Sequence, residues 1–312
     1  MATNGGRDGA VLVTGGSGFI GQQLVRRLAE QGRTVVALYH HKLPDARDNV
    51  YPVCCDMSSA ELLAGPLRGV ETVVHLAWQG GLAGPAGPVS FGLGNMLAPN
   101  AILLRNLTLA MEKAGTKRLI FLSAIGARHD AEAAFLREKY LAEHLVLNSR
   151  IPEKAIIRSS IVWGGQVAGG DRFLKSLVRV MRYPIYPLPK KSGPVAPVHV
   201  NDLAETLANV CSYPIQGQAA LLDVTGGEPY EVPELFRIVS SQVVRKTRLA
   251  LGGALGRSLL TFVERDDKTA VHPKIQQFLA IGGEGEEHVR RSNPLSAVLP
   301  QNPVRFREHL AD

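Results

Sequence analysis

A glycine-rich turn between an apolar run and a helical pattern is the feature that most constrains the fold of this 312-residue chain. Residues 10–13 read Ala-Val-Leu-Val, which predicts a buried strand, and residues 14–21 read Thr-Gly-Gly-Ser-Gly-Phe-Ile-Gly. Apolar residues then recur at helical spacing over residues 19–31, and Gly32 ends the pattern. A strand that turns through glycines directly into a helix predicts a phosphate-binding turn at the edge of a parallel sheet.

Three glycines at Gly-x-x-Gly-x-x-Gly spacing have distinct expected roles in this turn. Gly15 allows the tight turn, Gly18 lets the backbone approach a pyrophosphate, and Gly21 lets the helix pack closely on the sheet. The amino end of the helix offers unpaired N–H groups and a positive dipole end to the phosphates. The alternative is a structural turn without a ligand. The expected cofactor-binding residues of the turn are Gly15, Ser17, Gly18, Phe19, Ile20 and Gly21.

Short apolar runs and helical patterns alternate through the first half of the chain. Strands are expected over residues 34–38, 50–54, 72–76, 118–123 and 155–159, and helices over residues 58–64, 98–114 and 135–147. This alternation predicts an α/β fold, a doubly wound parallel Rossmann sheet with a smaller C-terminal substrate lobe. The expected domains are an NAD(P)-binding Rossmann domain over residues 1–164, to which residues 195–210 return, and a mixed substrate-binding lobe over residues 165–312.

Composition narrows the class of protein further. Hydrophobic residues make up 45% of the chain and charged residues 20%, which is an ordinary globular balance. No apolar run is long enough for a transmembrane segment, and residues 1–9 lack the apolar stretch of a secretory signal. Three cysteines cannot form a disulfide framework, so we expect a reducing, cytoplasmic location. The net charge of +7 is spread without basic runs or nucleic-acid motifs, which favours a phosphorylated cofactor over nucleic acid.

Several segments in order along the chain resemble the extended and atypical short-chain dehydrogenase/reductases. They are the glycine spacing, the sequence Cys-Cys-Asp-Met at residues 54–57, and the segments 74–77, 117–121, 158–164 and 198–204. The resemblance is strongest to the atypical group that includes the NADPH-binding subunit of respiratory complex I, and extends to the NAD-dependent epimerase/dehydratase family. It implies that Asp56 contacts the adenine amino group, with Met57 beside it. It also implies that Leu76, Ala77 and Trp78 lie at a strand end next to the cofactor.

The end of the second expected strand indicates which nicotinamide cofactor is preferred. An acidic residue at this point binds the ribose hydroxyls of NAD, whereas a basic residue accommodates the 2′-phosphate of NADP. Here the strand runs into His40 and Lys42, and no carboxylate appears before Asp45. NADP is therefore expected, with NAD less favoured. The alternatives are a solvated strand end or a histidine metal site, and no ligand partners at metal spacing support a metal.

The resemblance also implies a catalytic Ser/Thr, Tyr and Lys, in which the Tyr moves the proton and the Lys holds the nicotinamide ribose. Lys139 fits the lysine, but Phe135 stands four residues before it, where the family has Tyr. Ala124 occupies the usual serine position, and Ser123 precedes it. Tyr140 points about 100° away from Lys139 around the helix, so we interpret it as a packing residue. Ser123 and Lys139 are therefore the expected catalytic residues.

Two functions are consistent with these residues. The first is an NADP-dependent reductase-like enzyme that acts on a small organic substrate without the usual catalytic Tyr, the proton coming from Ser123, water or the substrate itself. The second is a non-catalytic NADP-binding structural or redox-sensing subunit of a larger complex, which the missing Tyr favours. The expected assembly is a monomer, a homodimer or a subunit of a complex.

Overall fold

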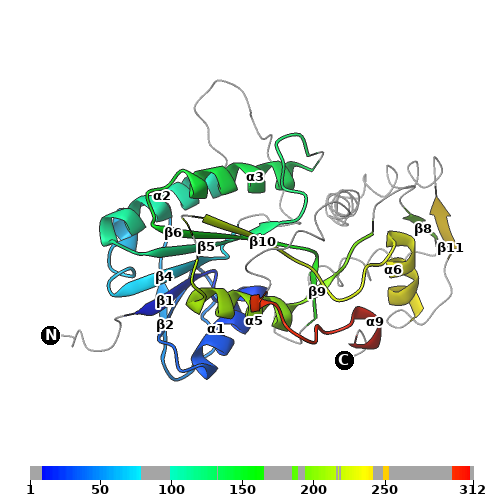
Figure 1. Cartoon of the computed structure of the whole chain (residues 1–312), viewed down its shortest axis with the longest axis horizontal. Coiled ribbons are helices and arrows are strands. Elements are labelled where there is room, and N and C mark those ends of the chain that lie inside the picture. Colours follow the sequence, from blue (N-terminus) through cyan, green and yellow to red (C-terminus); the bar gives the residue numbers. More distant parts are fainter. Residues whose placement is uncertain are drawn as a thin grey trace.

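Seven parallel strands form one central sheet (Figure 1). The computed structural model describes residues 9–78, 99–131, 133–164, 185–188, 194–215, 217, 219–241, 249–252 and 297–309. The strands are β1 (Ala10–Thr14), β2 (Val35–Tyr39), β3 (Val50–Cys54), β4 (Val70–His75), β5 (Arg118–Ala124), β6 (Glu153–Ser159) and β10 (Ala219–Val224). They lie in the order β10-β6-β5-β4-β1-β2-β3, and every neighbouring pair is parallel. The predicted doubly wound parallel sheet is confirmed.

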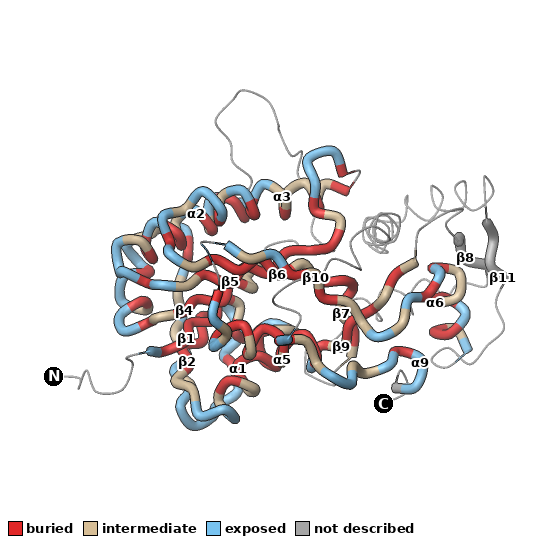
Figure 2. The backbone as a smooth tube through the Cα atoms, in the orientation of Figure 1, coloured by how far each residue is buried: buried red, intermediate tan, exposed pale blue. Residues whose placement is uncertain are grey.

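Helices cover both faces of the sheet (Figure 1). One face carries α1 (Phe19–Glu30) and α5 (Val200–Ser212), and the other carries α2 (Pro99–Ala114), α3 (Ala134–Leu147) and the short 3-10 helix η1 (Glu61–Leu63). Successive side chains of a strand point to opposite faces. Val11 and Val13 of β1 therefore pack under α1 and α5, whereas Ala10 and Leu12 pack under α2 and α3. Figure 2 shows that the central strands β1, β4 and β5 are buried, whereas the edge strands β3 and β10 are partly exposed.

The order of the strands reverses beside β1. From β1 the chain adds β2 and β3 on one side of the sheet, and then returns to add β4, β5 and β6 on the other side. The loops that follow β1 and β4 therefore leave the sheet in opposite directions. In open α/β sheets this arrangement creates a crevice at the carboxyl ends of the two strands, and ligands bind there.

Strand β10 and helix α5 extend the sheet layers beyond the first half of the chain. Residues 195–210, which were expected to return to the first domain, include most of α5, and this helix packs beside α1 on the sheet. Strand β10 was not predicted. It comes from the segment assigned to the lobe, yet it pairs with β6 along its whole length. The division of the chain at residue 164 stays a prediction, because most of residues 165–296 lies outside the described residues.

Smaller elements lie beyond the carboxyl edge of the sheet. They are β7 (Val162–Trp163) paired with β9 (Val198–His199), β8 (Ile185–Leu188) paired with β11 (Leu249–Gly252), α6 (Val232–Val239) and α9 (Phe306–His309). The buried ring of Phe306 in α9 packs edge-on against Trp163, with ring centres 4.8 Å apart. The backbone N–H of Val304 donates to Asp202 of α5 at 2.8 Å. Residues 297–309 are thereby attached both to α5, which packs on the sheet, and to β7, which lies beyond it. Among the described helices, none is long and apolar enough to cross a membrane.

Candidate cofactor and active site

The glycine turn after β1 is packed so closely that three of its residues have no room for a side chain. Gly15 has φ +68°, and a Cβ there would come within 3.0 Å of the backbone N of Ala77, which follows β4. A Cβ on Gly16 would lie 3.0 Å from the Cβ of Ala37 in β2, and one on Gly21 would overlap the carbonyl oxygen of Gly15. The turn therefore lies against both neighbouring strands. The contact of Gly16 with β2 was not predicted, because Gly16 stands at one of the variable x positions of the Gly-x-x-Gly-x-x-Gly spacing.

The amino end of α1 opens outward from this turn. Gly18 is the exposed N-cap residue, and neither a side-chain cap nor an acidic residue in the first turn satisfies the helix N–H groups. A helix N-terminus in this condition attracts an anion through its N–H groups and its dipole. Ser17 is half-buried, and the Gln22 Nε2 donates to its carbonyl oxygen at 2.9 Å, which fixes the turn from the helix side. The described residues thus fit the pyrophosphate of a dinucleotide.

Thr14 and His75 connect the ends of β1 and β4. The backbone N–H groups of Leu76 and Ala77 both donate to Thr14 Oγ1 at 3.1 Å, and this oxygen lies 2.8 Å from His75 Nδ1. Because the oxygen already accepts two bonds, its own proton goes to Nδ1 and the imidazole is neutral. Complete burial and the nearby charge of Lys139 lower the pKa of His75 to about 3, which keeps it neutral. The strand end where Leu76, Ala77 and Trp78 were expected beside the cofactor is therefore fixed next to the glycine turn.

The residues expected near the adenosine lie at the carboxyl ends of β2 and β3. His40 and Lys42 are exposed after β2, and His40 Nδ1 lies 2.8 Å from His41 Nε2. Asp56 is exposed after β3, and hydrogen bonds from Ser58 lower the pKa of its carboxyl below the usual value, with a smaller contribution from the nearby His40.

The loop after β3 is attached to α2 by one amide. The Asn106 side chain donates to the carbonyl oxygens of Met57 and Ser58 at 3.1 and 2.6 Å. This attachment holds buried Met57, and with it the neighbouring Asp56, at the edge of the sheet. No local pattern in the sequence indicates this contact of Asn106, since its partner Met57 lies 49 residues earlier.

Lys139 is a buried lysine surrounded by aromatic rings. Its side chain comes from α3, is 6% exposed, and donates from Nζ to the carbonyl oxygen of Leu122 at 2.8 Å. Nζ lies 3.6 Å from the ring centre of Trp78, 4.9 Å from that of Phe121 and 5.7 Å from that of Phe135. Ring faces attract the cation, but they replace water incompletely. Burial therefore lowers the pKa of Lys139 to about 7, although Glu143 and Glu138 oppose this shift.

Phe135 and Tyr140 lie on different sides of α3. The ring of Phe135 meets that of Trp78 edge-on, with centres 6.4 Å apart, so Phe135 belongs to the ring cage around Lys139. The ring of Tyr140 packs instead against His144, 4.5 Å between centres, and His129, 6.0 Å between centres. Both histidines are exposed. Thus Phe135 is one of the rings around the Lys139 ammonium, whereas the Tyr140 ring contacts His129 and His144.

Ser123 takes part in a buried charged cluster that the sequence analysis did not anticipate. Its hydroxyl, 2% exposed as a residue, donates to Glu143 Oε1 at 2.5 Å. Arg158 of β6 donates to both oxygens of the same carboxylate, at 2.8 Å from Nε and 2.6 Å from Nη2. The Ser123 proton is therefore engaged by Glu143, and the catalytic role expected for Ser123 stays a prediction. The only signal in the sequence was the position of Glu143, one helical turn after Lys139.

No metal centre accompanies these groups. Nowhere in the described part of the chain do three His, Cys, Asp or Glu side chains gather as metal ligands. Cys54 is exposed, Cys55 half-buried and Cys211 buried, and all three are free thiols.

The reversal of strand order beside β1, the uncapped amino end of α1 and the closely packed glycine turn are together the features of an NAD(P)-binding Rossmann domain. Residues 15–163 match the NAD(P)H-binding family. The predicted relationship to the NAD(P)-binding short-chain group is confirmed at this level.

Comparison with known proteins gives the range of activities in related chains. The ceramide reductase of Caulobacter vibrioides is 27% identical over 251 residues, covering 77% of this chain and 73% of the reductase. NADH dehydrogenase [ubiquinone] 1 alpha subcomplex subunit 9 of Arabidopsis thaliana, a mitochondrial protein, is 25% identical over 241 residues, covering 74% of this chain and 57% of that subunit. The crystal structure of a nucleoside-diphosphate-sugar epimerase from Staphylococcus aureus superposes with a TM-score of 0.71 at 17% identity, over 97% of this chain and 100% of the epimerase, and shows the shared fold.

Proposed function

We propose that this protein is an NADP-dependent reductase of a small organic carbonyl compound, working without the tyrosine that related reductases use. The observation that carries the proposal is Lys139, a buried cation in an aromatic cage beside the fixed end of β4. A buried, incompletely solvated ammonium is a costly feature that a purely structural helix does not need. The cofactor, when bound, supplies the hydride.

The residues of the crevice divide the proposed work between them. The amino end of α1, with Gly15, Gly18 and Gly21, binds the pyrophosphate. Asp56 and Met57 hold the adenine end, and the strand end at Leu76, Ala77 and Trp78 lies along the nicotinamide end. Lys139 contacts the reacting part of the site. The rings of Trp78, Phe121 and Phe135 line it with apolar surface, which favours a ketone on an apolar skeleton over a sugar.

NADP is the proposed cofactor because the end of β2 offers cationic groups and no carboxylate. His40 and Lys42 are exposed where a 2′-phosphate would lie, and the pair of imidazoles can donate to phosphate oxygens. Similarity to a ceramide reductase supports a ketone or alcohol of lipid character as the substrate class. We also retain the cytoplasm as the expected compartment, and a monomer or homodimer as the expected assembly.

A second function has its own supporting observation. Phe135 stands on the side of α3 that faces the site and has no proton to donate. Together with the similarity to a complex I subunit, this favours a chain that binds NADP without turnover and acts as a structural or redox-sensing subunit.

Cofactor titration followed by a turnover assay separates these functions. NADPH should bind more tightly than NADH, and His40→Asp should narrow the difference because a carboxylate repels the 2′-phosphate. Gly18→Val should weaken NADPH binding at least tenfold, about 1.4 kcal/mol. Gly65→Ala is the matched glycine control, because a Cβ there meets nothing within 4 Å.

The turnover assay follows the loss of NADPH absorbance with ketones of short and long alkyl chain. Consumption of NADPH with formation of the alcohol supports the reductase. Tight binding of NADPH without turnover of any ketone supports the subunit, and equal or absent binding of both nucleotides contradicts both proposals.

A further inference from the structure

We infer that the Lys139 ammonium is the proton donor of the proposed reduction and takes over the task of the missing tyrosine hydroxyl. The inference rests on the proposed function, and gives Lys139 a role beyond holding the cofactor. It is supported by what surrounds the ring cage, by the charges that face the ammonium, and by the chemistry of the step.

Neighbouring groups near the cage are unsuited to donate the proton. Phe135 has none, and the Ser123 hydroxyl is bonded to the buried carboxylate of Glu143. The Tyr140 ring packs against the exposed His129 and His144, and the rings at the Lys139 ammonium are those of Trp78, Phe121 and Phe135. His75 is neutral and accepts at Nδ1 from Thr14. Among the described residues around the cage, Lys139 is therefore the one that carries an acidic proton.

Among the described residues, the carboxylates that face Lys139 are themselves engaged by other groups. From its own helix, Glu143 is paired with Arg158 of β6 through two hydrogen bonds, so its negative charge is largely compensated. Glu138, also on α3, accepts a hydrogen bond from Asn100 of α2 at 3.2 Å. β4 contributes the neutral His75, and β5 contributes the ring of Phe121 and the carbonyl oxygen of Leu122.

This arrangement explains why the amine gives up its proton easily. Removal from water disfavours the charged form, and the compensated carboxylates restore too little of the lost solvation. The pKa of Lys139 accordingly falls to about 7. A general acid is most effective when its pKa lies near the working pH, because a useful fraction is protonated and the proton is readily transferred.

The proposed step balances in atoms and charge. Bound NADPH would supply a hydride, with its two electrons, to the carbonyl carbon, where a C–H bond would form. The π electrons of the C=O bond move to oxygen, and that oxygen takes a proton from Lys139 Nζ to form the alcohol O–H. NADPH is oxidised to NADP⁺, the carbonyl is reduced, and Lys139 is left as a neutral amine. Nζ can keep its hydrogen bond to Leu122 in both states, and water returns the proton.

The substitution Lys139→Arg separates proton donation from simple charge. Arginine keeps the positive charge and its donors, but it does not deprotonate in this pH range. We expect NADPH affinity within about threefold of the native value and kcat at least 100-fold lower, as loss of a general acid predicts. The native kcat should fall as pH rises through about 7, because the protonated amine is the active form. This limb should be absent from Lys139→Arg.

Two control variants test whether the changes in kcat and in its pH dependence are specific to Lys139. Lys154→Arg changes another buried lysine, whose Nζ donates to the carbonyl oxygens of Leu147 and Ser149, and kcat and its pH limb should stay unchanged. Glu138→Gln removes a charge that raises the pKa of Lys139, so the limb should move to lower pH while the maximal kcat is retained.

A direct titration gives a readout that does not depend on activity. In protein labelled with carbon-13 at the lysine Cε, the resonance missing from Lys139→Arg identifies Lys139, and its shift should titrate near pH 7 with and without NADPH. Titration near the ordinary lysine value, or native kcat in a folded Lys139→Arg, overturns the inference while leaving the reductase in place. NADPH binding without turnover of any ketone overturns the proposed function, and the inference with it.

Discussion

One Arg–Glu ion pair lies at the amino end of strands β5 and β6, and another lies at their carboxyl end. The two pairs differ in their burial and in the helix that each one contacts. At the amino end, Arg118 and Glu153 lie opposite each other in register and their side chains meet. At the carboxyl end, Ser123 lies opposite Arg158, and both bind Glu143 from α3. Glu153 has 37% of its side chain exposed, whereas Glu143 has only 4%.

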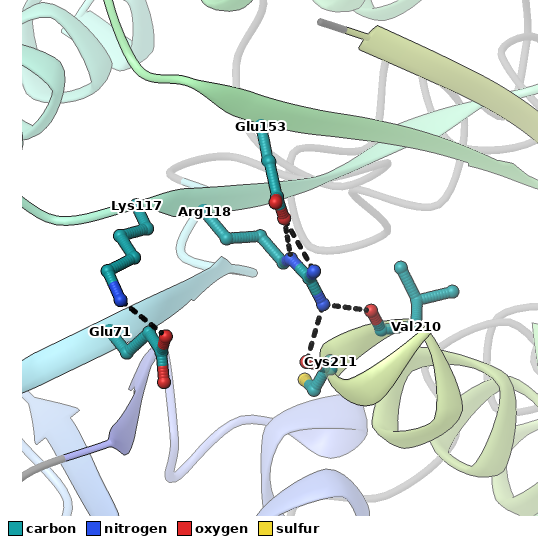
Figure 3. Close-up of polar contacts among 6 residues, drawn as sticks. All are labelled: Glu71, Lys117, Arg118, Glu153, Val210 and Cys211. Carbon is teal, nitrogen blue, oxygen red and sulfur yellow. Dashed lines mark hydrogen bonds and ion pairs between the residues drawn. The ribbon is translucent and has the colours of Figure 1, made fainter. Parts of the chain in front are cut away.

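The amino-end pair joins the sheet to a helix. Figure 3 shows Arg118 bridging Glu153 and the last turn of α5, where it donates to the carbonyl oxygens of Val210 and Cys211 at 3.1 and 2.6 Å. A cation at a helix C-terminus satisfies orphan carbonyls and complements the dipole. Every group here is partnered, and water reaches the carboxylate. The arrangement stabilises the fold and places no reactive group.

The carboxyl-end pair joins the sheet to the lysine's helix. Glu143 is engaged by Ser123 and Arg158. Among the described residues, Lys139, one turn earlier on α3, donates to a backbone carbonyl and lies among aromatic rings. The two ion pairs therefore differ in the groups that they position. At the amino end the ion pair attaches α5 to the sheet. At the carboxyl end it partly compensates the charge of Glu143, so that Glu143 raises the pKa of Lys139 less than burial lowers it.

Removal of Arg158 should have the largest effect, because it leaves a buried carboxylate without its partner. Arg158→Met should lower the free energy of unfolding by about 3–5 kcal/mol, measured by urea denaturation. The double variant Arg158→Met with Glu143→Gln removes both charges and should recover much of the loss. A loss below about 1 kcal/mol in the single variant would show that the buried pair contributes no more than an exposed one.

Removal of Arg118 should have an intermediate effect confined to stability. Arg118→Met breaks the bonds to Glu153 and to two helix carbonyls, and hydrogen bonds to charged groups contribute about 1.5–3 kcal/mol. We expect a loss of about 2 kcal/mol in urea denaturation and an unchanged NADPH dissociation constant. A weakened NADPH affinity in a fully folded Arg118→Met protein would contradict the separation of the two ends.

The parts of this molecule that could be predicted from sequence are those that depend on neighbours in the chain. Apolar runs alternating with helical patterns predicted α2 and α3 within a residue of their observed bounds. The spacing of the glycines predicted the turn between β1 and α1, because the constraint on Gly15 and Gly21 is local. Strand β10 was missed: its sequence, Ala-Ala-Leu-Leu-Asp-Val, is apolar apart from Asp223, and its place at the sheet edge depends on pairing with the distant strand β6.

The charged cluster could not be predicted because its members are brought together only by the fold. Ser123, Glu143 and Arg158 come from β5, α3 and β6, and no pattern in the sequence links their side chains. The same holds for Trp78, whose contact with Lys139 spans the sheet from β4 to α3. The sequence predicted Ser123, Lys139 and Trp78 as site residues, but the electrostatic environment of Lys139 depends on contacts that the fold makes between separate elements.

The smallest effect on the free energy of unfolding should come from Lys117, the residue next to Arg118. It tests whether burial or ion pairing determines how much a charged pair stabilises the amino end of the sheet. Lys117 donates to Glu71 at 3.1 Å in Figure 3, but its side chain is 69% exposed and that of Glu71 is 43% exposed. Exposed pairs gain little, because water solvates both charges already and salt screens their attraction. Lys117→Met should therefore change the free energy of unfolding by less than about 0.5 kcal/mol, and the difference should vanish in urea titrations at about 1 M salt, where the screening length is about 3 Å. A loss as large as that of Arg118→Met would mean that the ion pair itself, and not the helix carbonyls and the burial of Arg118, stabilises the amino end of the sheet.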